Sequence, residues 1–263
     1  MVYFVGAGPG APDLITLRGD KLLRCADMII YAGSLVNPAL LDTAKPGCEF
    51  YDSAGMTLEQ VIEKMQDADQ KGKKIVRLHT GDPSIYGAIR EQMDELDKCG
   101  IKYEVVPGVS SMNAAAAVLK TEFTLPGVSQ SVIVTRVSGR TPVPESEDIS
   151  SLAAHGATMV VFLSTGLIEK LVVDLLEGGY SSDCPAAIVY KATWPEEKII
   201  RTRISNLAEE AKREGIDSTA LIMIGGFLGK GYERSKLYHP EFSHGFRDGI
   251  DGSGSIGGDC DEA

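Results

Sequence analysis

The sequence of 263 residues is poor in the residue patterns that build disulfide frameworks and structural metal sites. Its five cysteines lie far apart, form no CxxC pair and have no histidine at ligand spacing. An odd, scattered set of this kind argues against disulfides and zinc, and is typical of a reduced protein. We therefore predict no metal ligands and a cytoplasmic location.

Dense positive charge and long hydrophobic runs are also lacking. The net charge is −11, and no basic run is longer than the pair Lys73 and Lys74. Because nucleic-acid binding usually needs a dense basic face, we predict that the protein binds no nucleic acid. The opening apolar run stops at Gly6, so neither a signal peptide nor a membrane span is expected.

The last residues are the most extreme in composition. From Gly245 the sequence reads "GFRDGIDGSGSIGGDCDEA", which is rich in glycine and acidic residues. Such a segment has too few apolar residues to bury a core, so we predict a disordered tail over 245–263.

What the sequence does contain, in its first half, is a repeated unit of apolar strand, Gly/Pro loop and helix. Thr16 is placed to cap the first helix, and the stretch "TLEQ" from Thr57 forms the capping box of a second. A third helix is expected over 84–98, and a fourth begins at Ser110 or Ser111. Strands and helices that alternate at this spacing predict a largely parallel sheet covered on both faces.

The second half differs because two of its strands follow each other closely. The segments "AIVYK" and "KIIRT" are only six or seven residues apart. So short a connection predicts an antiparallel pair and hence a mixed sheet. The predicted fold class is therefore α/β with two α/β domains, an N-terminal one over 1–126 and a C-terminal one over 127–244.

The opening loop matches a nucleotide-binding pattern in part. Gly6, Gly8 and Ala11 fit the G-x-G-x-x-A pattern of a dinucleotide-binding turn. That turn places its third small residue at the start of a helix, whereas Pro9 and Pro12 flank Ala11. It also needs an acidic residue at the end of the next strand, which here ends in "AGS". Both departures argue against a nicotinamide or flavin oxidoreductase, which stays an alternative beside a simple tight turn.

Three small-residue loops are expected at one edge of the first sheet. The stretches "GAGPG", "TGDPS" and "PGVSS" each follow a predicted strand. Each of them alone is explained by a turn or a helix cap. Ligands of open α/β sheets bind at the carboxyl ends of the strands, and small residues let the backbone approach a ligand. Together the three loops therefore predict a binding site.

Several longer stretches resemble one known family. They are "GAGPGAPDLITLRG", "YAGSLV", "HTGDPSIYGAIREQM", "VPGVSS", "TRVSGRTPVPE" and "IVYKATWPEEKIIRT". In order and spacing they are similar to the motifs of the tetrapyrrole (corrin/porphyrin) methylase family, from residue 2 to about residue 229. The opening loop and the GDP turn resemble the whole family, whereas "YAGSLV", "GRTPVPE" and "YKATWPEEKI" resemble the members that methylate C(11) of precorrin-4.

The resemblance implies two α/β domains, with S-adenosylmethionine (SAM) bound in the cleft between them and a tetrapyrrole in an adjacent trough. The implied reaction is methyl transfer to C(11) of a precorrin-4-type macrocycle, a small-molecule substrate, by a homodimer. Such a transfer depends mainly on holding methyl group and carbon in line. Methylases acting on another tetrapyrrole carbon, diphthine synthase and a non-catalytic tetrapyrrole carrier remain alternatives.

Carried onto this sequence, the resemblance assigns cofactor contacts to both domains. The implied SAM-binding residues are Pro9, Thr80, Gly81, Asp82, Ile85, Ser110, Ser111, Phe162, Leu163, Ser164, Tyr190, Lys191, Ala192, Ala220 and Leu221. Many relatives have Met-Gly after the "VVF" strand where this sequence has "LSTG". Which residue among 163–165 makes the contact therefore stays open.

The macrocycle is expected to contact a further set of residues. Because a precorrin carries many carboxylates, local cations are expected to bind it. The implied substrate-binding residues are Ser34, Tyr86, Arg90, Arg136 and Arg140. Asp13 is the candidate catalytic residue, for proton handling or for orienting a pyrrole N–H, with capping of the turn before Thr16 as the alternative. We expect Trp194 to brace a strand connection rather than to stack on the corrin.

Overall fold

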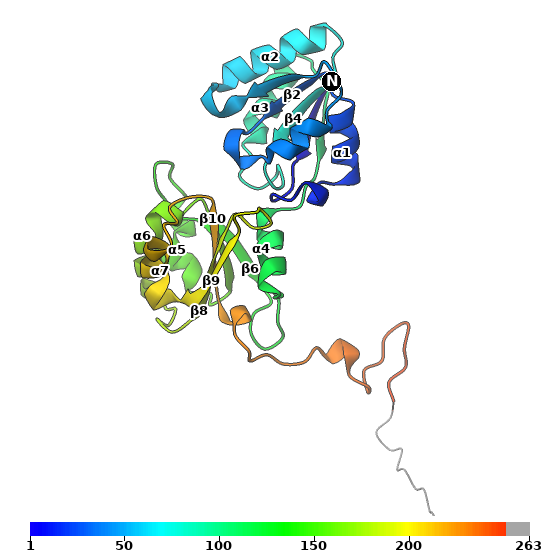
Figure 1. Ribbon diagram of the computed structural model, residues 1–263. Coiled ribbons are helices and arrows are strands. Elements are labelled where there is room, and N and C mark those ends of the chain that lie inside the picture. Colours follow the sequence, from blue (N-terminus) through cyan, green and yellow to red (C-terminus); the bar gives the residue numbers. More distant parts are fainter. Residues whose placement is uncertain (251–263) are drawn as a thin grey trace, which may run out of the picture.

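Two five-stranded sheets follow each other along the chain in the computed structural model, which describes residues 1–250 apart from the side chain of Ser34 (Figure 1). Residues 251–263, which make up most of the predicted tail, lie outside the described residues. Within residues 1–250, no helix has both the length and the apolar character that crossing a membrane requires.

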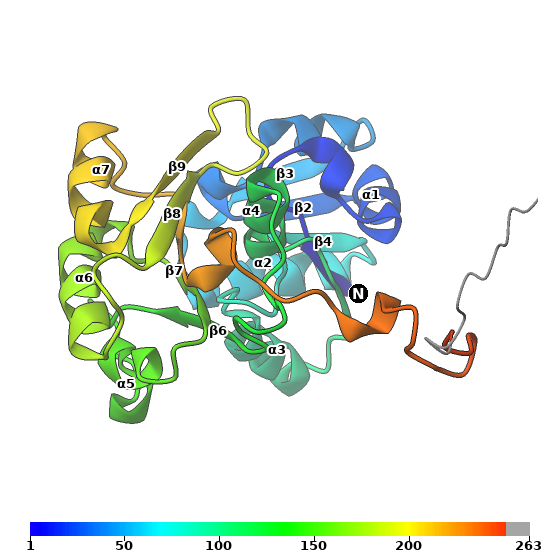
Figure 2. The same cartoon turned by 90° about the horizontal axis from the view of Figure 1, so that it is seen from below.

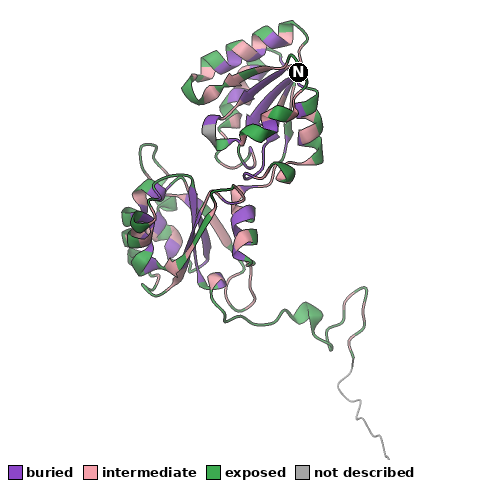
Figure 3. Ribbon diagram, in the orientation of Figure 1, coloured by how far each residue is buried: buried purple, intermediate pink, exposed green. Residues whose placement is uncertain are grey.

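The first sheet is entirely parallel, as the strand and helix pattern predicted. Its strands are β1 (Val2–Gly6), β2 (Met28–Tyr31), β3 (Glu49–Asp52), β4 (Ile75–His79) and β5 (Tyr103–Val106). They are arranged in the order β3-β2-β4-β1-β5. Both faces of β1 and β4 are buried (Figure 3), which explains why these strands read as continuous apolar runs.

Helices cover both faces of this sheet. One face packs against α2 (Leu58–Gln70) and α3 (Ile89–Lys98), and the other against α1 (Leu17–Arg24) and the 3-10 helix η3 (Pro38–Thr43). The predicted caps are confirmed, because the Thr16 side chain accepts a hydrogen bond from the Gly19 amide and Thr57 begins a complete capping box.

The second sheet is mixed. Its strands are β6 (Val132–Arg136), β7 (Thr158–Phe162), β8 (Pro185–Tyr190), β9 (Lys198–Arg203) and β10 (Ala220–Ile224), in the order β6-β7-β10-β8-β9. The β6–β7 pair is parallel and the other three pairs are antiparallel. The predicted antiparallel pairing of β8 with β9 is therefore confirmed.

Helices also lie on both faces of the second sheet (Figure 2). One face packs against α5 (Ile149–Ala153), α6 (Ile168–Glu177) and α7 (Leu207–Arg213), and the other against α4 (Ser111–Leu119). Although α4 precedes residue 126, its side chains Ala115 and Leu119 pack with the second sheet. Between the two sheets the chain therefore crosses through residues 107–110.

The third helix begins later than the sequence suggested. It was expected over 84–98, but α3 starts at Ile89 because Tyr86 and Ala88 have φ angles of 55° and 49°, outside the right-handed helical region. The remaining short elements are 3-10 helices: η1 (Pro12–Leu14), η2 (Gly33–Leu35), η4 (Ser53–Gly55), η5 (Glu145–Glu147), η6 (Thr165–Leu167), η7 (Ile204–Asn206), η8 (Gly226–Leu228) and η9 (Lys236–Tyr238).

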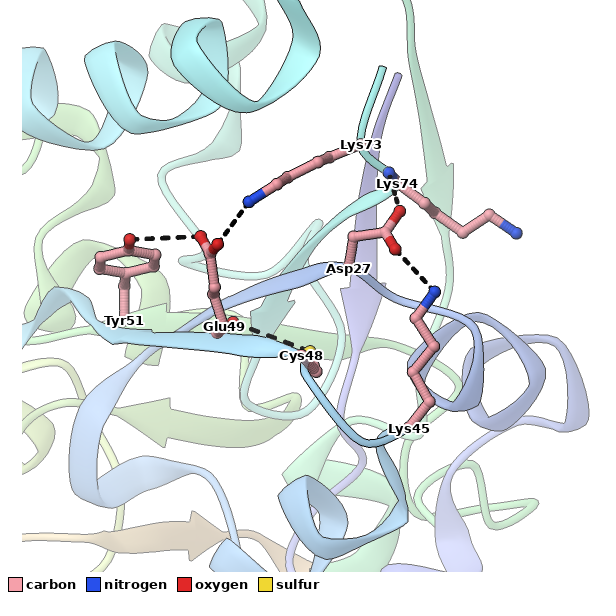
Figure 4. A network of polar contacts seen from close by, with 7 residues as sticks. All are labelled: Asp27, Lys45, Cys48, Glu49, Tyr51, Lys73 and Lys74. Atoms are coloured by element: carbon pink, nitrogen blue, oxygen red, sulfur yellow. Dashed lines mark hydrogen bonds and ion pairs between the residues drawn. The ribbon is translucent and has the colours of Figure 1, made fainter. Parts of the chain in front are cut away.

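Charged side chains gather at the amino end of the first sheet, just before β2, β3 and β4 (Figure 4). The Asp27 carboxylate accepts hydrogen bonds from Lys45 Nζ at 2.6 Å and from the Lys74 amide at 2.7 Å, and Lys73 pairs with Glu49. The hydrogen bond from Lys45 is the main reason why the pKa of Asp27 lies below its usual value. This end of the sheet is held by exposed ion pairs.

Candidate functional site

The three predicted loops meet at the carboxyl end of the first sheet. The Gly8 amide donates to the Gly81 carbonyl oxygen at 3.3 Å, and the Gly81 amide donates to the Gly8 oxygen at 2.8 Å. A Cβ atom on Gly6 would lie 2.6 Å from both Gly108 Cα and Gly81 O. The loops after β1, β4 and β5 are thus in backbone-to-backbone contact, which requires glycine.

Asp82 joins two of these loops through its carboxylate. Oδ2 accepts a 2.8 Å hydrogen bond from the Gly108 amide, and Oδ1 accepts bonds from the Ser84 amide, at 2.8 Å, and hydroxyl. Burial raises the pKa of Asp82, but the hydrogen bonds from Ser84 and Gly108 outweigh burial and hold the pKa below its usual value. The carboxylate therefore shapes the loop in its ionised form.

A cavity of about 380 Å³ lies between the two domains at this edge. The first domain contributes the loops around Pro9 and Gly81, and the 107–110 crossing leads into Ser110 and Ser111 on the cavity wall. The second domain contributes the ends of β7 and β8 and the beginning of β10, which meet at one edge because β10 runs antiparallel to both. The predicted cleft between two α/β domains is confirmed.

Backbone strain is concentrated around this cavity. Seven non-glycine residues in the described part of the chain have a positive φ angle, and four of them, Tyr86, Leu163, Lys191 and Thr219, line the cavity. Ala88 and Thr193 lie within two residues of lining positions. Such conformations cost free energy and cluster at functional sites in proteins. The strain therefore favours the cavity as the candidate functional site.

Apolar side chains stand exposed at the cavity. Leu163 has 69% of its surface exposed, and Leu35 and Tyr86 are also exposed. The ring of Tyr86 lies 5.4 Å from the ring of Phe162, so that the two domains touch beside the cavity. Exposed apolar side chains around a concave site indicate a ligand with apolar surface.

Two buried basic side chains lie on β4 directly below the loop. Arg77 Nε donates to Gln92 Oε1 at 3.0 Å, and burial lowers the pKa of Arg77 to about 10. Burial, together with the positive charge of Arg77, lowers the pKa of His79 to about 3. His79 is therefore neutral at pH 7 and is a packed residue of the strand.

Most of the residues implied for SAM come together at the cavity. The residues from this set that line it are Pro9, Thr80, Gly81, Asp82, Ile85, Ser110, Ser111, Phe162, Leu163, Lys191, Ala192, Ala220 and Leu221. Ser164 and Tyr190 do not line it. Ser164 is buried, and its Oγ accepts from the Val137 amide at 2.8 Å and donates to the Phe162 carbonyl oxygen at 2.6 Å, so its role in the structure is to hold the loop after β7.

The residues implied for the macrocycle are more scattered. Tyr86 lines the cavity, whereas Arg90 pairs with Asp94 on exposed α3. Arg136 donates to the carbonyl oxygens of Thr141, at 2.9 Å, and Pro142, at 2.7 Å, and thereby fixes the loop that carries exposed Arg140.

Ser34 and Asp13 are the two remaining predicted site residues. Ser34 lies in η2, next to cavity-lining Leu35. Asp13 is exposed in η1 and does not line the cavity. Asp13 lies in the turn before Thr16, and both interpretations of it stay predictions.

The sequence reasoning missed part of the cavity wall. Thr165, one of the three positions left open, lines the cavity, and the missed lining residues are Leu35, Gly166, Val189, Trp194, Asp217, Ser218 and Thr219. Residues 217–219 immediately precede β10, so a prediction that β10 is antiparallel to β8 would have placed them there. Trp194 was expected to brace the β8–β9 connection, but its Nε1 donates a 2.9 Å hydrogen bond to the Pro9 carbonyl oxygen of the other domain.

Comparisons with known proteins agree with this geometry. The family model of the Tetrapyrrole (Corrin/Porphyrin) Methylases matches residues 1–208. The chain is 56% identical over 247 residues to the cobalt-precorrin-4 C(11)-methyltransferase of Methanocaldococcus jannaschii, covering 94% of this chain and 95% of that protein.

Solved structures show the same fold. The X-ray structure of a cobalamin biosynthetic enzyme, cobalt precorrin-4 methyltransferase, aligns with a TM-score of 0.85 at 48% identity over 87% of this chain and 96% of that one. Uroporphyrin-III C-methyl transferase from Thermus thermophilus, complexed with S-adenosyl homocysteine, aligns with a TM-score of 0.69 at 28% identity over 86% and 92% of the two chains. The resemblance seen in the sequence is confirmed, and the chain belongs to the tetrapyrrole (corrin/porphyrin) methylases.

Proposed function

We propose that this chain is a SAM-dependent methyltransferase that methylates C(11) of cobalt-precorrin-4 to give cobalt-precorrin-5 in cobalamin biosynthesis. The observation that carries the proposal is the strained, apolar-rimmed cavity between the domains, in a chain similar over nearly its whole length to a cobalt-precorrin-4 C(11)-methyltransferase. The same cavity with a macrocycle that lacks cobalt, precorrin-4, is the nearest alternative.

The residues of the cavity fit SAM in size and chemistry. About 380 Å³ lies within the range of small-molecule sites. The Ser110 side chain makes no capping bond to α4, so the first amides of this helix are available. Ile85 and Leu221 offer apolar surface. A nucleoside with a charged amino-acid tail requires this mixture.

SAM, when bound, supplies a methyl group on a positively charged sulfur that leaves as a neutral thioether. The task of the protein is to hold this methyl group in line with the macrocycle carbon, and correct orientation alone contributes an effective molarity of about 10⁵ M or more. The paired loops at Gly8 and Gly81 fix one wall of the cavity, because their backbone hydrogen bonds leave little freedom. The exposed apolar side chains of Leu35 and Leu163 line the cavity and offer apolar surface to a bound ligand.

The carboxylates of the macrocycle are expected to bind cations near the cavity. Lys191 lines it, with its ammonium group 5.6 Å from the ring centre of Tyr190 and 3.8 Å from Glu196. Arg140 is exposed on the loop that Arg136 fixes. The side chains of Lys191 and Arg140 are the strongest candidates for binding the propionate and acetate groups of the macrocycle. A homodimer, implied by the family resemblance, and a cytoplasmic location, indicated by the scattered cysteines, complete the proposal, and light scattering in solution tests the dimer.

Transfer of label tests the proposed reaction. We expect label from methyl-labelled SAM to enter cobalt-precorrin-4, and mass spectrometry of the product to place it at C(11). Parallel reactions with cobalt-free precorrin-4 and with uroporphyrinogen III separate the alternatives. Methylation of uroporphyrinogen III alone would contradict the C(11) assignment, and absence of both transfer and S-adenosylhomocysteine binding by calorimetry would contradict the methyltransferase assignment.

A further inference from the structure

A segment of the second domain docks onto the opening loop of the first. Residues 191–194 follow β8, and Trp194 Nε1 donates a 2.9 Å hydrogen bond to the Pro9 carbonyl oxygen. One residue earlier, Thr193 Oγ1 accepts a 3.0 Å hydrogen bond from the Ala11 amide. The 8–11 loop is thus held from the second domain at two points.

Gly10 lies between these two points, and the absence of a side chain at this position leaves room for the indole of Trp194. A Cβ atom on Gly10 would overlap Cδ1 and Nε1 of Trp194 and would lie 2.9 Å from its Cγ. The φ angle of Gly10 is not positive, so its backbone conformation alone does not call for glycine. Glycine is needed at this position because of the contact with Trp194.

The backbone of residues 191–194 adopts a conformation that costs free energy. Lys191 and Thr193 have φ angles of 45° and 69°, and a β-branched residue such as threonine rarely adopts such an angle. Hydrogen bonds compensate, because the Thr193 amide donates to Glu197 Oε2 at 2.7 Å and the Trp194 amide donates to the Lys191 oxygen at 3.0 Å. The turn therefore presents the indole in one fixed orientation.

The contact lies on the cavity wall. Pro9, Lys191, Ala192 and Trp194 all line the cavity, and the ammonium group of Lys191 lies 5.5 Å from the ring centre of Trp194. A shift of the indole would therefore move both the 8–11 loop and the wall formed by residues 191 and 192.

We propose that Trp194 is a positioning residue for methyl transfer. Its indole packs against Gly10 and so fixes the 8–11 loop against the second domain. This contact sets the width of the cavity. This inference rests on the proposed methyltransferase function for its kinetic part only. The contact itself is a property of the chain, and its test does not depend on the identity of the macrocycle.

Substitution of Gly10 tests the contact while Trp194 itself is kept. Trp194 is the sole tryptophan in the sequence, so tryptophan emission, excited selectively over tyrosine, reports on the surroundings of this side chain. We expect Gly10→Ala to displace the indole towards water and shift the emission to longer wavelength. The matched control is Gly55→Ala, because a Cβ on exposed Gly55 meets no atom within 4 Å and its φ angle is not positive.

The kinetic readout separates positioning from binding. A misplacement of about 1 Å costs up to about 100-fold in rate. We therefore expect Gly10→Ala to lower kcat by about 10- to 100-fold. The Kd for S-adenosylhomocysteine, measured by calorimetry, is expected to change by a much smaller factor. Trp194→Phe, which keeps a ring but loses the N–H donor, is expected to lie between the wild type and Gly10→Ala.

A double variant makes the test decisive. Once Trp194→Ala removes the indole, addition of Gly10→Ala is expected to have no further effect on kcat or on the thermal unfolding midpoint. Equal effects of Gly10→Ala with and without the indole would overturn the proposal, as would unchanged emission and kcat in Gly10→Ala. If the wild type fails to methylate any precorrin, the proposed function fails, whereas emission and unfolding coupling still decide on the Trp194 contact.

Discussion

The two ends of the first sheet are built in opposite ways. At the carboxyl end, Gly6, Gly81 and Gly108 bring three loops into backbone contact below the cavity. At the amino end, β2, β3 and β4 begin among ion pairs such as that of Lys45 with Asp27, whose side chains are 43% and 36% exposed (Figure 4). The carboxyl end therefore relies on close backbone contacts that only glycine allows, whereas the amino end carries charged side chains in exposed ion pairs.

The two ends of the sheet also differ in how strongly a substitution changes their free energy. A backbone contact leaves no freedom for a neighbour to move, so any added atom forces the strands apart. An exposed ion pair is surrounded by water, which replaces either partner after a substitution. Substitutions at the two ends are therefore expected to differ strongly in their effect on stability.

The largest effect is expected for Gly108→Ala. The added Cβ would overlap the Gly81 carbonyl oxygen and lie 2.8 Å from Gly6 Cα. We expect the free energy of unfolding, measured in urea, to fall by about 3 kcal/mol. Gly55→Ala serves as the control and is expected to change it by less than about 0.5 kcal/mol. A stable Gly108→Ala variant would show that the three loops can separate.

Asp82→Ala is expected to have the next largest effect. It removes the acceptor of the hydrogen bonds from the Gly108 and Ser84 amides, and the loss is expected to be about 2 kcal/mol in the free energy of unfolding. Asp82→Asn keeps one acceptor oxygen and is expected to lose less.

The contribution of Asp82 to stability is expected to depend on pH. Since its pKa is lowered in the folded state, its contribution is complete above the pKa of the unfolded chain and disappears as the pH falls through the folded-state value. The difference in stability between wild type and Asp82→Ala should therefore shrink in acid. A difference that stays constant down to pH 2 would contradict the role of the ionised carboxylate.

At neutral pH, His79 at the same end is expected to affect stability less than Asp82, but its effect depends on pH and grows in acid. Its pKa falls from 6.5 to about 3 on folding, so between these values the unfolded chain binds a proton that the folded chain does not. Stability should therefore fall as the pH drops below 6.5, by up to about 1.4 kcal/mol per pH unit. The His79→Gln variant should show a flatter profile between pH 6.5 and 4.5. Parallel profiles would refute the assignment to His79.

The smallest effect is expected at the amino end. Lys45→Ala removes the 2.6 Å ion pair with Asp27, but both partners are exposed. We expect Tm in a calorimetric scan to change by no more than about 1 °C, because water and the Lys74 amide still solvate the Asp27 carboxylate. A decrease as large as that of Asp82→Ala would remove the contrast between the two ends.

Local signals in the sequence were sufficient for much of the fold. The caps at Thr16 and Thr57 predicted where two helices begin, and the short gap between β8 and β9 predicted their antiparallel pairing. The loops after β1, β4 and β5 were expected together because parallel strands end at one edge. In each case the information lies within a few neighbouring residues.

Contacts between distant segments were out of reach of such signals. The start of α3 was misplaced because a positive φ angle at Tyr86 has no mark in its residue type. Trp194 was assigned to the connection between β8 and β9, because no local pattern in the sequence indicates that Pro9 lies next to it in space. Ser164 resembled a cofactor contact from its place in the motif, whereas its hydroxyl is used by the backbone of Val137 and Phe162.

The crossing at residues 107–110 has a consequence for how the protein unfolds. It is the covalent link between the two sheets, and it ends on the cavity wall at Ser110. A molecule that fills the cavity contacts both halves and so adds to the contacts that Trp194 and Thr193 already make between them. Since such a molecule binds only when both halves are folded, its presence joins their melting into a single cooperative transition. The cavity is therefore also the place where the two domains become one thermodynamic unit.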